Sequence, residues 1–270
     1  METVQLLVDM WNAQVDPNIV TYNAAISACR KGGLWNEAME LVEEMQSGGL
    51  TMDVISYTAA ISACGEDWQR SLNLLSEMMD TNVAPDVVVY GATIRACQRG
   101  RQLDWALRLL RSMRAGSLAP DLITYNTVIS TCDQAREWEL ALQLLGEAEA
   151  GGLAPDLLSF SSAISACAGV GRWESALDLL GTMRSRYIVP DRIAYSAALE
   201  ACARGPRQWT TALRLLQMMQ VEGVGPDAAN LATAAAACDG ASESAWAEKL
   251  RARRGSPQQE HTLVGATDRR

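Results

Sequence analysis

The sequence predicts an all-α fold, an α-solenoid of stacked helix-turn-helix repeats. Three observations indicate this fold: a regularly recurring cysteine, apolar residues at helical spacing, and Pro-Asp pairs that separate the units. The cysteines are 35, 33, 35, 35, 35 and 36 residues apart, and they are Cys29, Cys64, Cys97, Cys132, Cys167, Cys202 and Cys238. Helical hairpins that bury their apolar stripes only against neighbouring hairpins stack into a solenoid.

The repeat boundaries follow from aligning the chain on these cysteines. Six complete repeats result, at residues 19–53, 54–86, 87–121, 122–156, 157–191 and 192–227. Residues 1–18 match the second half of a repeat, and residues 228–254 form a degenerate seventh repeat. The polar residues 255–270 lack periodicity, so we expect a disordered tail.

Each repeat contains two helical stripes. In the fourth repeat, Tyr125, Ile129 and Cys132 lie at i, i+4 and i+7, on one face of a first helix. The stripe Trp138, Ala141, Leu144 and Leu145 describes a second helix with one apolar side. We expect its Trp, like the others at this position, to lie in the core between helices rather than to stack on bases.

Proline and aspartate separate one repeat from the next. Proline cannot continue a helix and aspartate can cap the following one, so each pair ends one repeat and begins another. These pairs are Pro85-Asp86, Pro120-Asp121, Pro155-Asp156 and Pro190-Asp191.

The cysteines are expected to be reduced and buried. Disulfide frameworks and zinc sites need thiols that converge, whereas one thiol per repeat is spread along the stack. The sequence therefore predicts neither a metal site nor a bound cofactor.

Composition excludes several functions. With a net charge of −9, nonspecific binding of nucleic acid by a broadly basic surface is not expected. No apolar stretch is long enough to span a membrane. The only histidine, His261, lies in the tail expected to be disordered, so we expect no histidine-dependent catalytic triad, and the zinc deaminase signature is absent. We therefore expect a protein without catalytic activity.

Residues 1–18 contain acidic residues and no Lys or Arg, so they match neither a secretory signal nor an organellar transit peptide.

Several segments resemble the pentatricopeptide repeat family. Pro17-Asn18-Ile19-Val20-Thr21-Tyr22-Asn23 and Pro120-Asp121-Leu122-Ile123-Thr124-Tyr125-Asn126 carry the resemblance, and the tetratricopeptide pattern W-x-x-L-G-x-x-Y is absent. The resemblance covers about residues 1–250 and is to P-type arrays. It implies a right-handed superhelix that binds single-stranded RNA, one base per repeat, with neither DNA nor a membrane as partner.

The resemblance also implies which residues choose the base. In this family they are the residue after the Tyr and the last residue of the repeat, here called the reading pair. The six pairs are Asn23 with Asp53, Thr58 with Asp86, Gly91 with Asp121, Asn126 with Asp156, Ser161 with Asp191, and Ser196 with Asp227. By this resemblance Asn with Asp favours U and Thr or Ser with Asp favours G, so the array would read 5′-UGNUGG-3′. Gly91 has no side chain, so the third repeat should show almost no preference among the bases.

Two further residue sets follow from the resemblance. The family holds each base between aliphatic side chains two residues before the Tyr, here Val20, Ile55, Val88, Ile123, Leu158 and Ile193. A basic residue two places after the Cys faces phosphate, here Lys31, Arg99 and Arg204.

Alternative interpretations remain for these residues. The aliphatic residues could only pack one repeat on the next, and the terminal Asp residues could only cap helices. The whole chain could instead be a scaffold that binds proteins through the same surface. For the RNA-binding hypothesis, the resemblance implies organellar RNA processing, stability or translation, in the chloroplast in preference to the mitochondrion.

Overall fold

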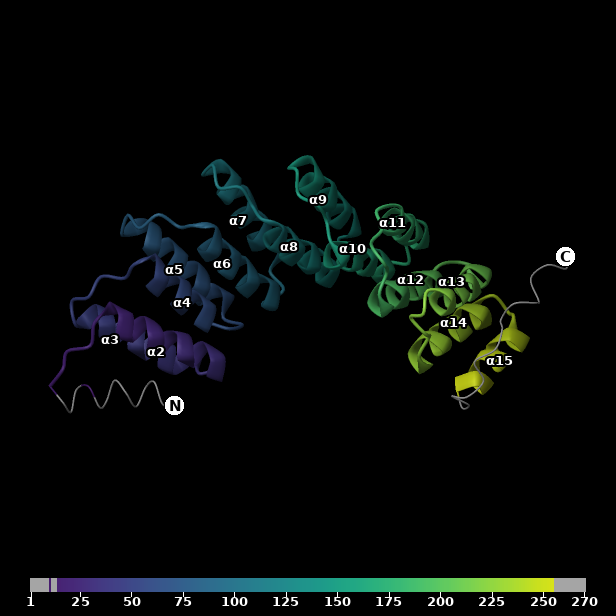
Figure 1. Cartoon of the computed structure of the whole chain (residues 1–270), viewed down its shortest axis with the longest axis horizontal. Helices are drawn as coiled ribbons and strands as arrows, with labels where there is room; N and C mark the ends of the chain where they lie inside the picture. Colours follow the sequence, from purple (N-terminus) through teal and green to yellow (C-terminus); the bar gives the residue numbers. More distant parts are fainter. Residues whose placement is uncertain (1–9, 11–13, 255–270) are drawn as a thin grey trace. The chain divides into compact units, whose positions relative to one another are not determined.

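The computed structural model describes residue 10 and residues 14–254, and the described chain contains fourteen α-helices and no strand. The prediction of an all-α fold of stacked hairpins is confirmed (Figure 1). The first helices of the hairpins are α2 (Ile19–Gly32), α4 (Val54–Ala63), α6 (Val87–Arg99), α8 (Leu122–Ala135), α10 (Leu157–Gly169), α12 (Arg192–Arg204) and α14 (Ala228–Gly240). The second helices are α3 (Trp35–Ser47), α5 (Trp68–Asp80), α7 (Leu103–Ala115), α9 (Trp138–Ala150), α11 (Trp173–Ser185), α13 (Trp209–Val221) and α15 (Ser244–Arg254).

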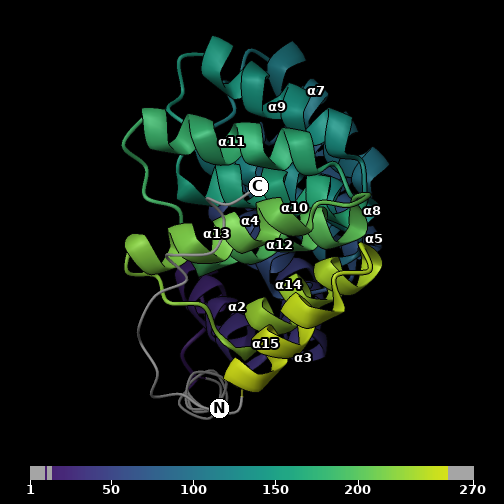
Figure 2. The same ribbon diagram turned by 90° about the vertical axis from the view of Figure 1, so that its right-hand side faces the viewer.

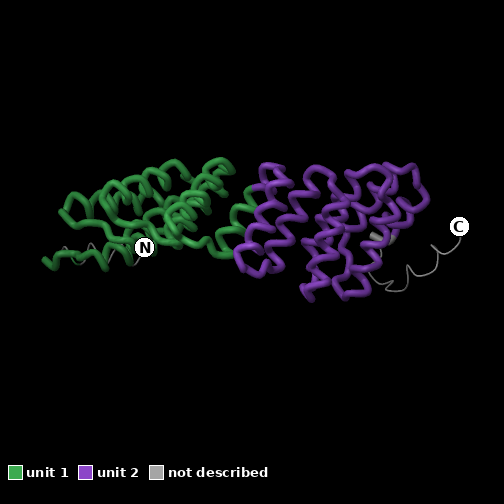
Figure 3. Tube along the Cα trace, turned by 90° about the horizontal axis from the view of Figure 1, so that it is seen from above, with its two compact units in different colours: residues 1–131 green, residues 132–270 purple. Residues whose placement is uncertain are grey.

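The chain divides into two compact units, residues 1–131 and residues 132–270 (Figure 3). The boundary falls within α8. In unit 1 the first helices pack side by side, α2 on α4 and α4 on α6. In unit 2, α10 packs on α12 and α12 on α14, as Figure 2 also shows. Second helices such as α5 and α11 pack between the first helix of their own hairpin and that of the next. Each unit therefore has a layer of first helices and a layer of second helices.

The core of each unit lies between these two layers. The predicted first-helix stripe is buried, for example Phe160, Ile164 and Cys167 in α10. The second-helix stripe is buried as well, with Leu179 and Leu180 of α11 facing inward. All seven cysteines are buried and free, as the spacing predicted.

The tryptophans at the start of the second helices lie at the edge of this core rather than inside it. Trp35 is 41% exposed, and the guanidinium of Arg70 lies 5.5 Å from the centre of its ring. Trp68 packs against Gly100 of the next repeat so closely that a Cβ at Gly100 would clash with its ring. The expectation of a core position was therefore only partly right, since these rings also cover the junction with the next hairpin.

Candidate nucleic-acid interface

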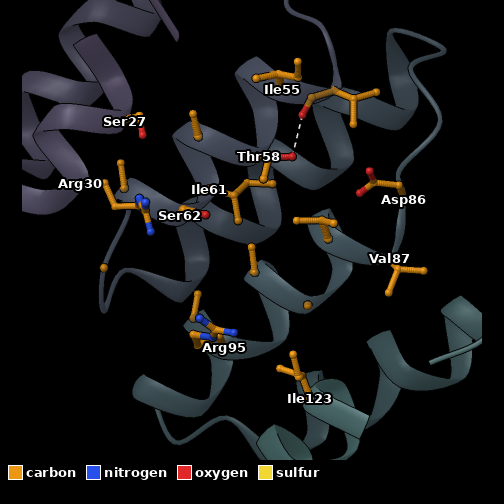
Figure 4. A pocket seen from close by; sticks show the side chains of 18 of the residues that line it. Ser27, Arg30, Ile55, Thr58, Ile61, Ser62, Asp86, Val87, Arg95 and Ile123 are labelled. Atoms are coloured by element: carbon orange, nitrogen blue, oxygen red, sulfur yellow. Dashed lines mark hydrogen bonds between the residues drawn. The ribbon is translucent and has the colours of Figure 1, made fainter. Parts of the chain in front are cut away.

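A groove of about 930 Å³ is lined by the first helices of unit 1, from α2 to the start of α8. Many predicted site residues line it, namely Asn23, Thr58, Gly91, Asp86 and Asp121 of the reading pairs and the aliphatic residues Ile55, Val88 and Ile123. Figure 4 shows the Thr58 hydroxyl between the Asp86 carboxylate on one side and the guanidinium groups of Arg30 and Arg95 on the other. The groove thus brings together predicted residues from successive repeats.

The reading pair of the first repeat is in direct contact. Asn23 Nδ2 donates to Asp53 Oδ1 at 3.4 Å. The other atom of this amide, Asn23 Oδ1, is buried and has no hydrogen-bond partner among the described residues. Burial tends to raise the pKa of Asp53, but hydrogen bonds from Ser56 and Asn23 outweigh it and hold the pKa below its usual value. Asp53 is therefore a carboxylate at neutral pH.

The Thr and Ser side chains of the reading pairs differ in their hydrogen bonds. Thr58 Oγ1 donates to Val54 O at 2.6 Å, and Ser196 Oγ donates to Arg192 O at 2.7 Å. Because each of these hydroxyls has one proton, both can only accept further hydrogen bonds. Ser161 Oγ, in contrast, is buried and has no partner within the described part of the chain.

Ser196 also accepts a hydrogen bond from the following repeat. Asn230 Nδ2 donates to Ser196 Oγ at 2.7 Å, while Asn230 Oδ1 accepts from the backbone of Asp227 at 3.0 Å. One of the two lone pairs of Ser196 Oγ is thereby occupied. The sixth reading pair thus has less free hydrogen-bonding capacity than the second.

The last residue of every complete repeat caps the next helix. Each of these carboxylates accepts through Oδ1 from the backbone N–H three residues on, at 2.8–2.9 Å, in Asp53, Asp86, Asp121, Asp156, Asp191 and Asp227. The capping role that was the alternative interpretation is therefore present in all six. It uses one carboxylate oxygen and is compatible with a second role for the other.

The aliphatic residues two places before the aromatic are exposed. Their exposed fractions are 59–68%, although each belongs to a helix that packs on its neighbours; they are Val20, Ile55, Val88, Ile123, Leu158 and Ile193. Packing of one repeat on the next does not explain side chains that remain this exposed. Water-facing aliphatic groups arranged once per repeat are apolar surfaces that a planar ligand could cover.

Two of the three basic residues predicted to face phosphate form contacts within the protein. Arg99 Nη1 donates to Gly65 O at 3.4 Å, and Arg204 Nη1 donates to Gly169 O at 2.7 Å. Arg204 also forms a salt bridge of 2.6 Å with Glu200. These arginines hold the turn of the preceding repeat. The third predicted phosphate contact is Lys31, whose side chain is not among those that the structure describes.

Sequence reasoning missed two arginines of the groove. Arg30 and Arg95 are exposed, line the groove of unit 1, and take part in no ion pair within the described part of unit 1 (Figure 4). They stand one residue after Cys29 and two residues before Cys97, whereas only the position two residues after the Cys had been considered. Arg95 stands four residues before Arg99 on the same helix face, so testing that face would have found it, whereas nothing considered in the sequence pointed to Arg30.

The equivalent positions of unit 2 carry no cation. Asp133 follows Cys132 as Arg30 follows Cys29, and Ser165 and Glu200 stand two residues before their cysteines, as Arg95 does. Burial raises the pKa of Asp133 and the Glu200 carboxylate raises it further, against a hydrogen bond with Ser165. At these positions, basic charge is therefore confined to unit 1.

The described residues offer neither a membrane span nor a metal-binding cluster. No described helix is both long enough and apolar enough to cross a bilayer. No group of three or more His, Cys, Asp or Glu side chains in the described chain could hold a metal ion.

Stacked hairpins with site residues once per repeat define an α-helical repeat protein. Models of the PPR repeat family, the pentatricopeptide repeat domain and pentatricopeptide repeat-containing proteins match residues 17–66, 73–134 and 121–247. The chain belongs to the pentatricopeptide repeat family. None of the curated proteins matches the sequence.

Solved structures share this fold. The maize pentatricopeptide repeat protein PPR10 is 20% identical with a TM-score of 0.61, over 92% of this chain and 40% of that one. PPR10 in complex with an 18-nt psaJ RNA element is 19% identical with a TM-score of 0.58, over 94% and 42%. The PPR domain of Arabidopsis thaliana protein-only RNase P 1, in complex with tRNA, is 14% identical with a TM-score of 0.60, over 68% and 97%. This chain thus spans less than half the length of PPR10.

Proposed function

We propose that this chain is a noncatalytic protein that binds single-stranded RNA sequence-selectively, reading one base per repeat. The observation that carries the proposal is a pair of buried polar atoms without partners at reading positions, Asn23 Oδ1 and Ser161 Oγ. Such an atom costs about 1–3 kcal/mol when it is left unsatisfied. A base edge that supplies the missing hydrogen bond removes this cost, and the exposed aliphatic side chains beside it cover the faces of the base.

The hydrogen bonds give a physical reason for a preference for U in the first repeat. Asn23 Nδ2 is directed to Asp53, which leaves Asn23 Oδ1 as an acceptor for the base. Uracil presents a donor, N3–H, on its Watson–Crick edge, whereas N3 of cytosine is an acceptor. An acceptor at Asn23 therefore favours U over C.

The same reasoning favours G in the second repeat. Thr58 has given its proton to a backbone carbonyl, and the Asp86 carboxylate only accepts. Guanine donates from N1–H and from its 2-amino group, whereas N1 of adenine accepts. Extended over the six reading pairs with the family's preferences, the proposed target is 5′-UGNUGG-3′, with N opposite Gly91.

Local basic groups provide the phosphate contacts in this proposal. The net charge of −9 opposes binding over the whole surface, but Arg30, Arg95 and Arg99 line the groove of unit 1. Lys31 and Arg204 stay candidates for the same role. The affinity should therefore depend mainly on the first three repeats.

The biological setting is proposed from the family. PPR10 has been solved with an RNA element and the PPR domain of protein-only RNase P 1 with tRNA, which supports RNA as the ligand of this chain. We propose a role in organellar RNA processing, stability or translation, in the chloroplast in preference to the mitochondrion. In this role the chain acts by binding its transcript, without catalysis and without a cofactor.

Selection of bound oligonucleotides from a random RNA pool tests the function. The expected result is enrichment of 5′-UGNUGG-3′, with weaker binding of single-stranded DNA of the same sequence. A pool that shows no enrichment would overturn the proposal and favour a protein-binding scaffold.

A point variant separates the ligand-binding surface from the fold. Ile55→Ala should weaken binding of the selected RNA while leaving the thermal midpoint nearly unchanged, because Ile55 is 65% exposed. Its matched control, Ile94→Ala on the next first helix, removes a fully buried side chain that does not line the groove, and it should cost about 2–5 kcal/mol of stability.

A further inference from the structure

The third residue of several first helices holds the carboxylate of the preceding reading pair. Ser56, Thr124 and Ser159 each donate a side-chain hydroxyl to Oδ1 of Asp53, Asp121 and Asp156, at 2.8, 2.7 and 2.9 Å. Their backbone N–H groups donate to the same oxygens. In these repeats, two bonds from one residue fix the carboxylate.

Other repeats lack this second bond. Val89 and Ala194 occupy the equivalent position, and they donate to Asp86 and Asp191 only through the backbone. The chain therefore contains repeats with and without the hydroxyl, which gives an internal comparison.

At the first reading pair, the Ser56 hydroxyl begins a chain of contacts that ends at Asn23 Oδ1. Ser56 is fully buried and, unlike Asn23, does not line the groove. Its Oγ bonds Asp53 Oδ1, and this oxygen also accepts from Asn23 Nδ2. The second amide atom, Asn23 Oδ1, is left without a partner.

We propose that Ser56 is a positioning residue that sets base selectivity in the first repeat, an inference that rests on the proposed function. Ser56 fixes the Asp53 carboxylate, and the carboxylate fixes the orientation of the Asn23 amide. The terminal torsion of an Asn side chain is broad and roughly two-fold. When only the backbone N–H of Ser56 holds Asp53, the carboxylate is a less fixed acceptor, and the amide can turn more readily and present Nδ2, a donor, to the base. Discrimination between uracil, which donates from N3, and cytosine, which accepts there, then falls.

The experiment measures dissociation constants of Ser56→Ala for four RNAs that differ only at the first base. The ratio of the dissociation constants for C and U should fall about 2- to 12-fold, the range of one hydrogen bond. The preference at the second base, read by Thr58 and Asp86, should stay as in the unmodified chain. An unchanged ratio at the first base overturns the inference.

Two further variants separate positioning from stability. Ser71→Ala removes another fully buried hydroxyl. Ser71 lies in the second helix α5, and its hydroxyl donates to the backbone carbonyl of Asp67. It should lower the thermal midpoint as Ser56→Ala does and leave base selectivity unchanged. Ser56→Thr should restore selectivity, because Thr124 makes the same two bonds to Asp121. If Ser71→Ala reduces selectivity equally, the effect is one of stability and the inference fails.

A gain-of-function variant tests the same rule in unit 2. Ala194→Ser gives the fifth reading pair, Ser161 with Asp191, the hydroxyl that it lacks, and it should strengthen the preference of this pair for G. Ser56 and Ser159 are fully buried at the same position, as Ala194 is, so the change fits this environment. A preference for G that stays the same argues against the rule.

Asn23→Ala separates failure of the inference from failure of the proposed function. If Asn23→Ala abolishes the preference for U and Ser56→Ala does not alter it, base reading stands and the positioning role is wrong. If Asn23→Ala also has no effect, reading by this pair is wrong, and the role of Ser56 falls with it.

Discussion

Asn23 and Asp53 are 30 residues apart in sequence and are joined by a hydrogen bond of 3.4 Å from Nδ2 to Oδ1. The bond links the first helix of one repeat to the residue that starts the first helix of the next. It orients the amide, with Nδ2 bound to Asp53 and Oδ1 left without a hydrogen-bond partner among the described residues. The free chain therefore already holds one orientation of the Asn23 amide.

Changing Asn23→Thr should move the preference at the first base from U toward G. The new hydroxyl can donate to a carbonyl of its own helix, as Thr58 does, and then only accepts. One hydrogen bond is worth roughly 0.5 to 1.5 kcal/mol net, or about 2- to 12-fold in affinity. Fluorescence anisotropy with RNAs varied at each position would measure the shift, which should be confined to the first base. Equal weakening for all four bases would show that Asn23 is not a reader.

Replacing Gly91→Asn should create a preference for U in the third repeat, where none is expected now. An added Cβ would lie 3.8 Å from Thr124 Oγ1, an ordinary contact distance, so there is room for the side chain. Stability should hold or rise slightly, because Gly is the poorer helix former. Binding of RNAs that differ only at the third base tests this. Equal affinity for all four would contradict the reading role of this position.

The salt dependence of RNA binding should be shallow. Contacts from Arg30, Arg95 and Arg99 give a slope of log affinity against log salt of about −2, at roughly −0.7 for each phosphate contact on a single strand. Arg30→Ala with Arg95→Ala should reduce the slope to about −0.7. Arg186→Ala, which removes a salt bridge to Glu149 in unit 2, serves as the control and should leave the slope unchanged. A slope near −6 in the unmodified protein would reveal a basic surface elsewhere.

The thiols should be unreactive in the folded chain. Burial raises the pKa of Cys132 and Cys202 to about 12 and that of Cys64, Cys97 and Cys167 to about 11. Because the thiolate is the nucleophile, alkylation at pH 8 should be at least about 100-fold slower in the folded chain than in urea. Mass spectrometry would follow the labelling. Rapid labelling of any of these five cysteines in the folded chain would contradict its buried position.

The same shift predicts how stability changes at alkaline pH. In the unfolded chain a thiol ionises near its ordinary pKa of 9, and in the folded chain only well above it. Between these values the unfolded state binds fewer protons, so the free energy of unfolding falls as the pH rises. The thermal midpoint should therefore fall above about pH 9. The thermal midpoint of the Cys132→Ala variant should fall less steeply with pH than that of the unmodified chain.

The sequence predicted the helices because their signals are local. The aromatic-Ile-Cys stripe and the capping Asp residues each lie within one helix or one turn, and the cysteine interval only repeats this local pattern along the chain. The tryptophans were placed less well, because their environment depends on the next repeat: a Gly at position 100 brings that hairpin close to Trp68.

The positions of the candidate site residues came from the family resemblance, and their hydrogen bonds could not be predicted. The resemblance pointed to Asn23 and Asp53, but the orientation of their amide and carboxylate depends on side-chain torsions that the sequence pattern does not contain. The contact of Arg204 with Gly169 O joins residues 35 apart and needs the stacked structure. Ser56 escaped notice because it resembles an ordinary helix-starting serine.

The caps restrict what this array can evolve to recognise. Asp53 and its five counterparts cap the following helices. A substitution at any of them therefore changes the stability of the fold, whatever its effect on binding. Asn, Ser and Thr also start helices well, whereas Ala at a cap costs roughly 0.5–2 kcal/mol. Substitutions that keep the protein stable at these six positions should therefore be limited to about four short polar residues, Asp, Asn, Ser and Thr. New specificities can spread more freely through Asn23, Thr58 and their equivalents, which lie inside their helices and are not caps.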